Sequence, residues 1–473
     1  MDFINHTPFP ALAFEGIDQR NQQFHVVVLR QTLTWNQHGK LIYADQQQPL
    51  CEADQFLGAT NQSVVRQESD LCHYKPRCDV IVNAVAHAPR GRPALRFAVR
   101  LVLKRQRLDA ALIDKTLSVI GPRRFTHTGD PVGQHGATTR KAWRLGEPEP
   151  IQRLALHNQF AFGGECRIDQ GEPAARQLAQ RYWLTPEQLD GHPDAQRPSA
   201  EQPAAHSVFE ANPLGLGFVE NWYIEATGLA SFPAPQIENP DMPISVELFA
   251  DCANGGLSET QAASLVAGFG VRPKAHPERR KLVGTIDEAF INGEAWLPAD
   301  FDFNIWNAAP PDQQTEFLEG GEMLELTNLC APDSPGATID TQGNTLLRLE
   351  LPSQECFVLV RLQSGGMFTH PMVIDTVIIE PENRRLSLVW RIVLGKDQEL
   401  PIRKLEARMR SFADRDAERS EVERIKGLLS KAMEHSDKSM QTNSPTLPPI
   451  QVKPDDLTDD EFEAWVKGVL KDG

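Results

Sequence analysis

Residues 284–322, GTIDEAFINGEAWLPADFDFNIWNAAPPDQQTEFLEGGE, decide how this chain can fold. The stretch combines tryptophan and phenylalanine with Pro298, Pro310 and Pro311, which prevent a long helix or a central strand from running through it. Aspartate and asparagine residues lie between the aromatic ones, and their short side chains can bond nearby backbone amides and hold a loop. The stretch therefore predicts a compact, aromatic and irregular segment that interrupts the regular secondary structure.

The carboxylates in and near this segment are the first candidates for chemistry. Catalysis by paired carboxylates needs two of them in opposed environments at a defined separation, and the spacing here does not indicate such a pair. Turn and cap roles explain the same residues, so we predict no catalytic residue. A hydrolase remains the alternative, and it would bring several carboxylates together in an open cleft. The candidates are Asp287, Glu288, Asp300, Asp302 and, outside the segment, Glu238.

The composition is that of a chain with a large core. It has 473 residues, of which 40% are hydrophobic and 24% charged, and this length predicts more than one domain. The formal net charge of -16 argues against nucleic acid or an anionic membrane as the main partner, because phosphates would be repelled over most of the surface. A basic protein partner is easier to accommodate.

The N-terminus and the cysteines indicate a cytoplasmic protein. Residues 1–14 contain Asp2, Pro8 and Pro10 where an export signal needs a basic start and a continuous apolar run. No window approaches eighteen uninterrupted apolar residues, so we expect no membrane span. The seven cysteines are scattered and odd in number, which is typical of reduced thiols.

The first 125 residues predict an N-terminal β domain. Residues 24–35 are dense in β-branched and aromatic side chains, and Asn36–Gly39 supplies a turn before Leu41–Tyr43, so we predict a hairpin. Residues 79–86 predict a further strand, and residues 95–103 alternate apolar and polar side chains as a half-buried strand does.

Residues 126–340 predict a loop-rich core that holds the aromatic segment. Glycine, proline, histidine and asparagine dominate its first half, in which residues 174–184, AARQLAQRYWL, predict one helix, and a short helix is expected near 259–266. Loops of this length are uncommon unless they bind something or are held by specific packing.

Residues 341–400 predict a β-meander that completes the β body. Its expected strands are 345–351, 356–362, 372–379 and 385–394, and Pro381–Arg384 is the clearest turn between them. After Pro401 we predict an amphipathic helical region to residue 434, because Leu405, Met409 and Phe412 recur at helical spacing. The predicted fold is mainly β, in the α+β class, with packed antiparallel sheets, long irregular loops and C-terminal helices.

The C-terminal residues predict a short helix on a tether. Residues 435–454 have the polar, proline-containing composition of a flexible linker. Residues 455–473 begin with a capping box of Thr458 and Glu461 and continue with an apolar face. Such a helix is marginal alone in water and must bury that face, either on its own body or in a groove of another protein. The face consists of Phe462, Trp465, Val466, Val469 and Leu470.

Signals for cofactors and metals are weak. Gly215–Gly217 lacks the third glycine and the strand-to-helix context of a dinucleotide fingerprint, and no phosphate-binding loop is present. Two groups of residues offer metal ligands without a recognised ligand spacing, so we predict no cofactor and no metal site. The two groups are Cys72, His73 and Cys78, and His127, Asp130 and His135.

Short motifs spread over most of the chain up to about Pro352 resemble a bacterial family catalogued as domain of unknown function 2169. Their order and spacing, rather than any one motif, carry the resemblance. They are TPF at 7–9, ESDL at 68–71, KP at 75–76, DVIVN at 79–83, AHAP at 86–89, FGG at 162–164, NPLGLGF at 212–218, PQIE at 235–238, GFG at 268–270, GTID at 284–287, LPADFD at 297–302 and NAAPPDQ at 307–313.

The resemblance implies a non-enzymatic cytoplasmic adaptor or chaperone. Members of this family lie beside type VI secretion spike genes and look like proteins that load effectors. The implied partners are an effector linked to a PAAR domain and the VgrG spike, and the oligomeric state stays open. A carbohydrate-binding or other ligand-binding module is a further alternative, and it would align aromatic faces on a concave surface. Outside the C-terminal helix, the candidate partner-binding residues are Trp222, Tyr223, Trp296 and Trp306.

Deletion of residues 455–473 tests the role of the C-terminal helix. Because the predicted linker separates this helix from the body, we expect the deletion to weaken binding of one partner without unfolding the body. A pull-down with each partner and a thermal unfolding curve measure the two effects. An unchanged pull-down would exclude the helix from partner binding.

Overall fold

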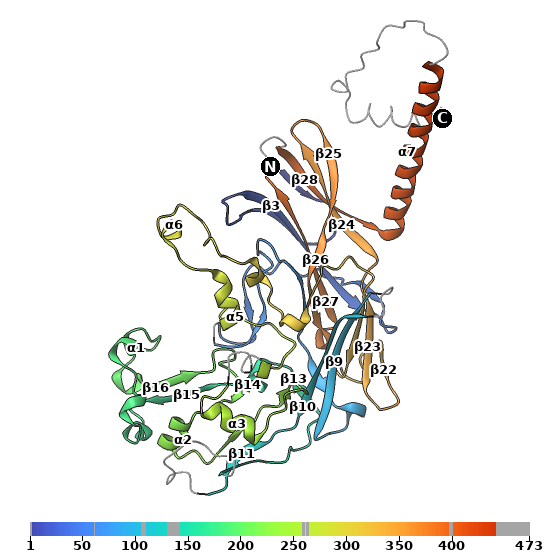
Figure 1. Ribbon diagram of the computed structural model, residues 1–473. Coiled ribbons are helices and arrows are strands. Elements are labelled where there is room, and N and C mark those ends of the chain that lie inside the picture. The colour runs from blue at the N-terminus through green and yellow to red at the C-terminus, as the bar shows by residue number, and fades with distance from the viewer. Residues whose placement is uncertain are drawn as a thin grey trace. The chain divides into compact units, whose positions relative to one another are not determined.

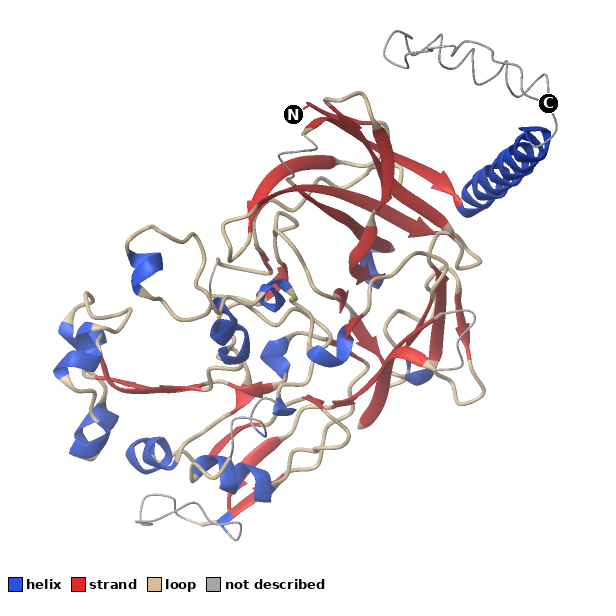
Figure 2. Cartoon of the chain, turned by 45° about the horizontal axis from the view of Figure 1, so that its top comes forward, coloured by secondary structure: helices blue, strands red, loops and turns tan. Residues whose placement is uncertain are grey.

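The computed structural model describes residues 2–60, 62–105, 110–129, 142–257, 261, 264–396 and 401–440. The chain divides into two units, residues 1–412 and 413–473 (Figure 1). Strands dominate the first unit, and the described part of the second continues helix α7, Phe412–Met440 (Figure 2). The fold is therefore mainly β. None of the described helices combines the length and the apolar character that crossing a membrane requires.

The largest sheet has seven strands in the order β2-β3-β27-β26-β7-β20, with β4 beside β3. The predicted hairpin is confirmed, since β3 and β4 pair antiparallel across the Asn36–Gly39 turn. β3 is buried from Phe24 to Leu33, and this buried stretch includes the polar side chains of His25, Arg30, Gln31 and Thr32. The strands are β2 (Ala11–Ile17), β3 (Gln23–Trp35), β4 (Leu41–Tyr43), β7 (Cys78–Val82), β20 (Gln314–Thr315), β26 (Val373–Glu380) and β27 (Arg385–Gly395).

A second sheet has six strands in the order β19-β10-β9-β21-β23-β22. The alternation predicted for residues 95–103 is confirmed from Arg96 onward, because Phe97, Val99, Leu101 and Leu103 of β9 are buried while Arg96 and Arg100 are exposed. The prediction is wrong for Leu95, which precedes the strand and is 51% exposed. Its strands are β9 (Arg96–Lys104), β10 (Ala111–Ile120), β19 (Ile237–Glu238), β21 (Met323–Thr327), β22 (Ala337–Ile339) and β23 (Thr345–Glu350).

A third sheet, in the order β1-β28-β24-β25, corrects the prediction of helix directly after Pro401. Residues 402–411 form strand β28, which pairs antiparallel with β24 and parallel with β1. Leu405 and Ala407 are fully buried and Met409 packs against the same core, so the apolar period here is two rather than 3.6. The strands are β1 (Asp2–Asn5), β24 (Gln354–Leu362), β25 (Met367–Pro371) and β28 (Ile402–Ser411).

The predicted meander of residues 345–394 is wrong as a single sheet. Its strands β23, β24, β26 and β27 exist, but they belong to three different sheets. Only β26 and β27 are neighbours, and they join through the predicted turn, where Arg384 takes a positive φ of 46°. Each strand satisfies its backbone hydrogen bonds with partners distant in sequence, which local patterning does not specify.

The predicted helix at residues 174–184 is also wrong. Two 3₁₀ turns replace it, η5 (Pro173–Arg176) and η6 (Gln180–Tyr182). The chain bends between them so that Ala175 and Leu178 enter an apolar core. Packing therefore outweighs helix propensity here. Half of the helix expected near residues 259–266 falls outside the described residues, and Gln261, Ser264 and Leu265 in the described half are helical.

Short elements fill the rest of the first unit. The small strands are β5 (Gln55–Phe56), β6 (Val65–Gln67), β8 (Val85–His87), β11 (Arg124–His127), β12 (Trp143–Leu145), β13 (Arg153–Ala155), β14 (Phe162–Gly163), β15 (Glu165–Asp169), β16 (Pro203–Val208), β17 (Leu216–Gly217) and β18 (Ser231–Pro233). The helices are α1 (Pro186–Asp190), α2 (Asn221–Thr227), α3 (Val246–Ala253), α5 (Pro277–Arg280) and α6 (Glu288–Ile291). The further 3₁₀ turns are η1 (Pro89–Gly91), η4 (Asn158–Phe160), η7 (Ser199–Glu201), η8 (Lys281–Val283), η9 (Phe303–Trp306), η10 (Pro311–Gln313) and η11 (Pro381–Asn383).

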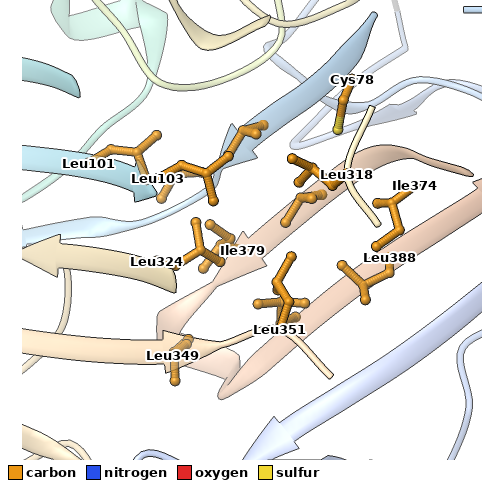
Figure 3. Close-up of a cluster of buried hydrophobic side chains, with 14 of the residues drawn as sticks. Cys78, Leu101, Leu103, Leu318, Leu324, Leu349, Leu351, Ile374, Ile379 and Leu388 are labelled. Atoms are coloured by element: carbon orange, nitrogen blue, oxygen red, sulfur yellow. The ribbon is translucent and has the colours of Figure 1, made fainter. Parts of the chain in front are cut away.

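Two large apolar cores and one small apolar cluster hold these elements. The larger core joins all three large sheets, and it includes Leu101 and Leu103 of β9 and Ile379 and Leu388 of the neighbouring sheet (Figure 3). The small cluster consists of Ile81, Val271, Ala308, Ala309 and Ile378. The smaller core lies in the loop-rich region of residues 125–265 and is rich in aromatic rings. In it the rings of Phe125, Phe232 and Phe249 lie within about 5 Å of one another, centre to centre.

The Asp79 carboxylate fastens the aromatic segment to β7. Asp79 is fully buried and accepts hydrogen bonds from the backbone amides of Ala308 (2.9 Å) and Ala309 (3.2 Å) and from Nδ2 of Asn307 (3.1 Å). Lys75 Nζ donates to the same carboxylate at 2.8 Å. Burial opposes the charge on Lys75, but Asp79, Cys72 and Asp375 together outweigh this effect and raise the Lys75 pKa.

Other buried polar side chains extend this fastening. Gln313 Nε2 donates to the carbonyl oxygens of Val80 (2.7 Å) and Phe269 (3.0 Å). Arg279, which is fully buried, forms a two-pronged pair with Glu68 at 2.6 and 2.9 Å. The segment also reaches α5, because Arg279 Nε donates to Ile305 O at 3.1 Å. It therefore joins β7 and α5 through buried polar contacts, with only the two residues of β20 in a strand pair with β7.

Asp79→Asn tests this anchor. The substitution leaves the Lys75 ammonium buried without a countercharge, so we expect the free energy of unfolding to fall by about 3–5 kcal/mol. The matched control is Asp114→Asn, which breaks the exposed ion pair with Arg100 and should cost about 0–1 kcal/mol. Urea unfolding measures both. Equal losses in the two variants would show that Asp79 is no anchor.

Candidate interaction surface

Residues 283–301 leave the body as a loop that carries α6, and we call them the arm (Figure 1). The two ends of the arm meet at a narrow neck. Asp300 accepts hydrogen bonds from the backbone amide (2.7 Å) and the hydroxyl (2.9 Å) of Thr285, and Asp302 N donates to Leu282 O at 2.9 Å. Gly284 has a φ of +85°, and a Cβ there would lie 2.5 Å from Asp300 Oδ1. The neck therefore requires glycine.

The arm is held at two further places. Asp287 caps α6 by accepting a hydrogen bond from Phe290 N at 2.8 Å. The turn between β2 and β3 contacts the returning part of the arm, where Asn21 Nδ2 donates to Glu294 O (3.2 Å) and Trp296 N donates to Asn21 Oδ1 (3.4 Å). These contacts give the arm a defined backbone.

Large apolar side chains of the arm face solvent. Trp296 is 72% exposed, Ile291 70% and Ile286 63%, and Phe290 and Val283 are also exposed. A soluble protein scatters single apolar side chains over its surface, but five on one short loop are typical of an interaction site. The arm is therefore the candidate interaction surface.

The charge of the arm is of one sign. Asp287, Glu288, Glu294 and Asp300 are its only charged side chains, and no lysine or arginine occurs between Gly284 and Asp302. A partner surface that combines apolar and basic side chains would complement it.

Most of the carboxylates considered for catalysis have a hydrogen-bond partner within the protein. The bonds from the Thr285 amide and hydroxyl lower the pKa of Asp300. Asp302 caps η9 by accepting a hydrogen bond from Asn304 N at 2.8 Å. Glu238 lies buried in β19 and pairs with Arg123, although burial raises its pKa. Asp287, Asp300 and Asp302 thus bond backbone amides, while Glu238 bonds the side chain of Arg123 in the segment between β10 and β11.

The predicted partner-binding aromatics lie in different environments. Trp222 is 8% exposed, packs in the smaller core and donates from Nε1 to Glu220 Oε2 at 2.6 Å, and Tyr223 is half-buried beside it. Trp306 is half-buried under Lys274 Nζ, which lies 5.6 Å from its ring centre. Of the four, only Trp296 is exposed. Phe462, Trp465, Val466, Val469 and Leu470 lie outside the described residues.

The candidate metal ligands have packing roles. Cys72 and Cys78 are buried, and burial raises the pKa of both thiols. His73 packs edge-on against the ring of Trp306, while Asp130 and His135 lie outside the described residues. Among the residues that the structure describes, no three histidine, cysteine, aspartate or glutamate side chains gather as a metal site would require.

Most of the exposed apolar side chains of the arm were not identified from the sequence. Ile286, Phe290 and Ile291 were not predicted as partner-binding residues. The available signal was a set of apolar residues in a stretch that also contains glycine, proline and several acids, with no helical or strand period to bury them.

The comparisons with known proteins identify the family. The family described as an uncharacterized protein conserved in bacteria (DUF2169) matches residues 20–391. Since this is most of the chain, the protein belongs to that family. No curated protein and no solved structure matches it.

Gly284→Ala tests the neck. The methyl group would meet Asp300 Oδ1, so we expect faster amide hydrogen exchange throughout the arm. Gly293→Ala is the matched control, because Gly293 also has a positive φ (+73°) but has no atom within 4 Å of the added methyl. Exchange that rises equally in the two variants would mean that the neck does not hold the arm.

Proposed function

We propose that this member of the DUF2169 family is a cytoplasmic adaptor of type VI secretion. In this proposal it is not an enzyme: it binds an effector linked to a PAAR domain and presents that effector to the VgrG spike. The observation that carries the proposal is the arm, a loop with a fixed neck along which five large apolar side chains face solvent.

The physical chemistry of the arm favours protein binding. Burying an exposed tryptophan or isoleucine contributes about 1.5–3 kcal/mol, and a loop that is already ordered loses little further entropy on binding. The acids around these side chains would select a basic partner surface and reject acidic ones.

The positions of the acids support a scaffold over a hydrolase. A carboxylate pair that cleaves a substrate needs two groups facing one reacting bond. Asp287, Asp300 and Asp302 instead stabilise local backbone turns of the arm and its neck. These bonds explain why acids occur at those positions without any reaction.

Copurification tests the proposal. We would purify the full chain from the bacterium that encodes it and identify the bound proteins by mass spectrometry. The wild-type chain should retain a PAAR-domain protein or VgrG. A variant with Ile286, Ile291 and Trp296 changed to serine should lose at least about tenfold of that protein, because the apolar contact area is gone.

A second triple variant controls for the loss of apolar surface itself. Ile42, Leu95 and Ile339 are exposed and lie outside the arm, so their change to serine should leave copurification intact. Recovery of no secretion protein with the wild-type chain would contradict the adaptor proposal. Equal recovery of the secretion protein with the two triple variants would show that the arm does not bind it.

A further inference from the structure

A cleft of about 420 Å³ opens in the body of the first unit. Residues 114–117 of β10 line one part of it, and Gly268, Gly270 and Pro310–Asp312 line others. These residues belong to separate parts of the chain, and none of them is in the arm. The size lies within the range of sites that bind small molecules or short peptide segments.

One wall of the cleft is an unpaired strand edge. β9 pairs with β10 along its length, but on the other edge β19 pairs only with Ser118 and Val119. Ile120 N donates to Gln236 O at 2.8 Å on that edge, and strand alternation directs the main-chain groups of Thr116 and Asp114 to the same side. Among the described strands, none pairs with this edge from Asp114 to Leu117.

Two glycines add main-chain groups to the cleft. Within the described part of the chain, no hydrogen bond reaches the main-chain N–H or C=O groups of Gly268 and Gly270. Phe269 between them is fixed, because its carbonyl oxygen accepts from Val82 N and Gln313 Nε2, both at 3.0 Å. The position of a Cβ on Gly270 has no atom within 4 Å, so this backbone is open to close approach.

The lysine and the arginine that line the cleft are already paired. Lys115 Nζ lies 2.9 Å from Asp312 Oδ1 and 2.8 Å from Gln313 Oε1, and burial lowers its pKa. Arg272 pairs with Glu278 at 2.5 Å. A small anion would have to compete with these carboxylates, whereas a polypeptide backbone needs only the free N–H and C=O groups.

We propose that this cleft binds an extended polypeptide segment of a partner protein, which adds as a strand to the free edge of β10 beside Gly268 and Gly270. The free edge of four residues is about 13 Å long. Strand addition of this kind takes its affinity from main-chain hydrogen bonds and its specificity from alternate side chains. The identity of the partner rests on the proposed function, but the peptide chemistry of the cleft does not.

Selection from a random peptide library tests the cleft. Displayed peptides of about twelve residues, long enough to span the free edge, are selected on the full chain, and the affinity of the winning peptide is measured by fluorescence anisotropy. We expect Gly270→Leu to weaken binding at least about tenfold, because the leucine side chain fills the cleft. Gly395→Leu is the matched control, since Gly395 also has no atom within 4 Å of an added Cβ and does not line the cleft.

Hydrogen exchange locates the bound peptide. Amides in residues 111–117 should exchange more slowly in its presence, because Thr116 N–H becomes a donor in the new ladder. Failure to select any peptide, equal binding by Gly270→Leu, or unchanged exchange in β10 would each overturn the proposal. A selected sequence that matches residues 441–473 of the chain itself would overturn the assignment to a partner.

The test is independent of the secretion proposal. It uses no secretion protein, so a failed selection leaves the copurification result standing. Conversely, suppose that the chain selects peptides but retains no PAAR-domain protein or VgrG. That result would support peptide binding in the cleft and contradict the adaptor proposal.

Discussion

The buried Asp79 carboxylate is the interaction on which the rest of the structure depends. It receives the Lys75 ammonium on one side and the amides of Asn307, Ala308 and Ala309 on the other. A buried carboxylate without these donors would be strongly destabilising, so β7 and the segment after the arm must come together for either to be stable. A stretch with three prolines, which cannot enter a central strand, is thereby made part of the body.

The buried polar contacts around Asp79 also form the framework from which the arm extends. Gln313 and Arg279 continue the polar contacts of Asp79 on both sides of the arm. The arm begins at Val283, the last residue of η8, and ends before η9, so both its ends rest on this framework. Its apolar side chains are exposed because the neck and the Asn21 contacts satisfy its backbone without burying them. The arm and the cleft offer different chemistry, apolar side chains in one and main-chain hydrogen bonds in the other.

Many of the motifs that carry the family resemblance have an internal structural role. Glu68 pairs with Arg279, Asp70 with Arg30 at 2.8 Å, and Lys75 with Asp79. Gly163 and Gly217 take positive φ angles, and a Cβ on Gly163 would overlap Asn212 O at 2.1 Å. These residues hold the scaffold together. The surfaces proposed for binding also use some of the motifs. The arm contains GTID and most of LPADFD, and the cleft is lined by parts of GFG and NAAPPDQ.

The sequence by itself determined the elements whose signals are local. The β3–β4 hairpin, strand β9, the turn at Pro381–Arg384 and the irregular character of residues 284–322 follow from side-chain period and turn chemistry within a few residues. Only the tertiary structure decided that residues 402–411 are a strand, that successive strands enter three sheets, that Trp222 is buried while Ile286 and Ile291 are exposed, and that the β10 edge is free. Exposure and strand pairing depend on neighbours hundreds of residues away, and no local pattern encodes which of them arrives.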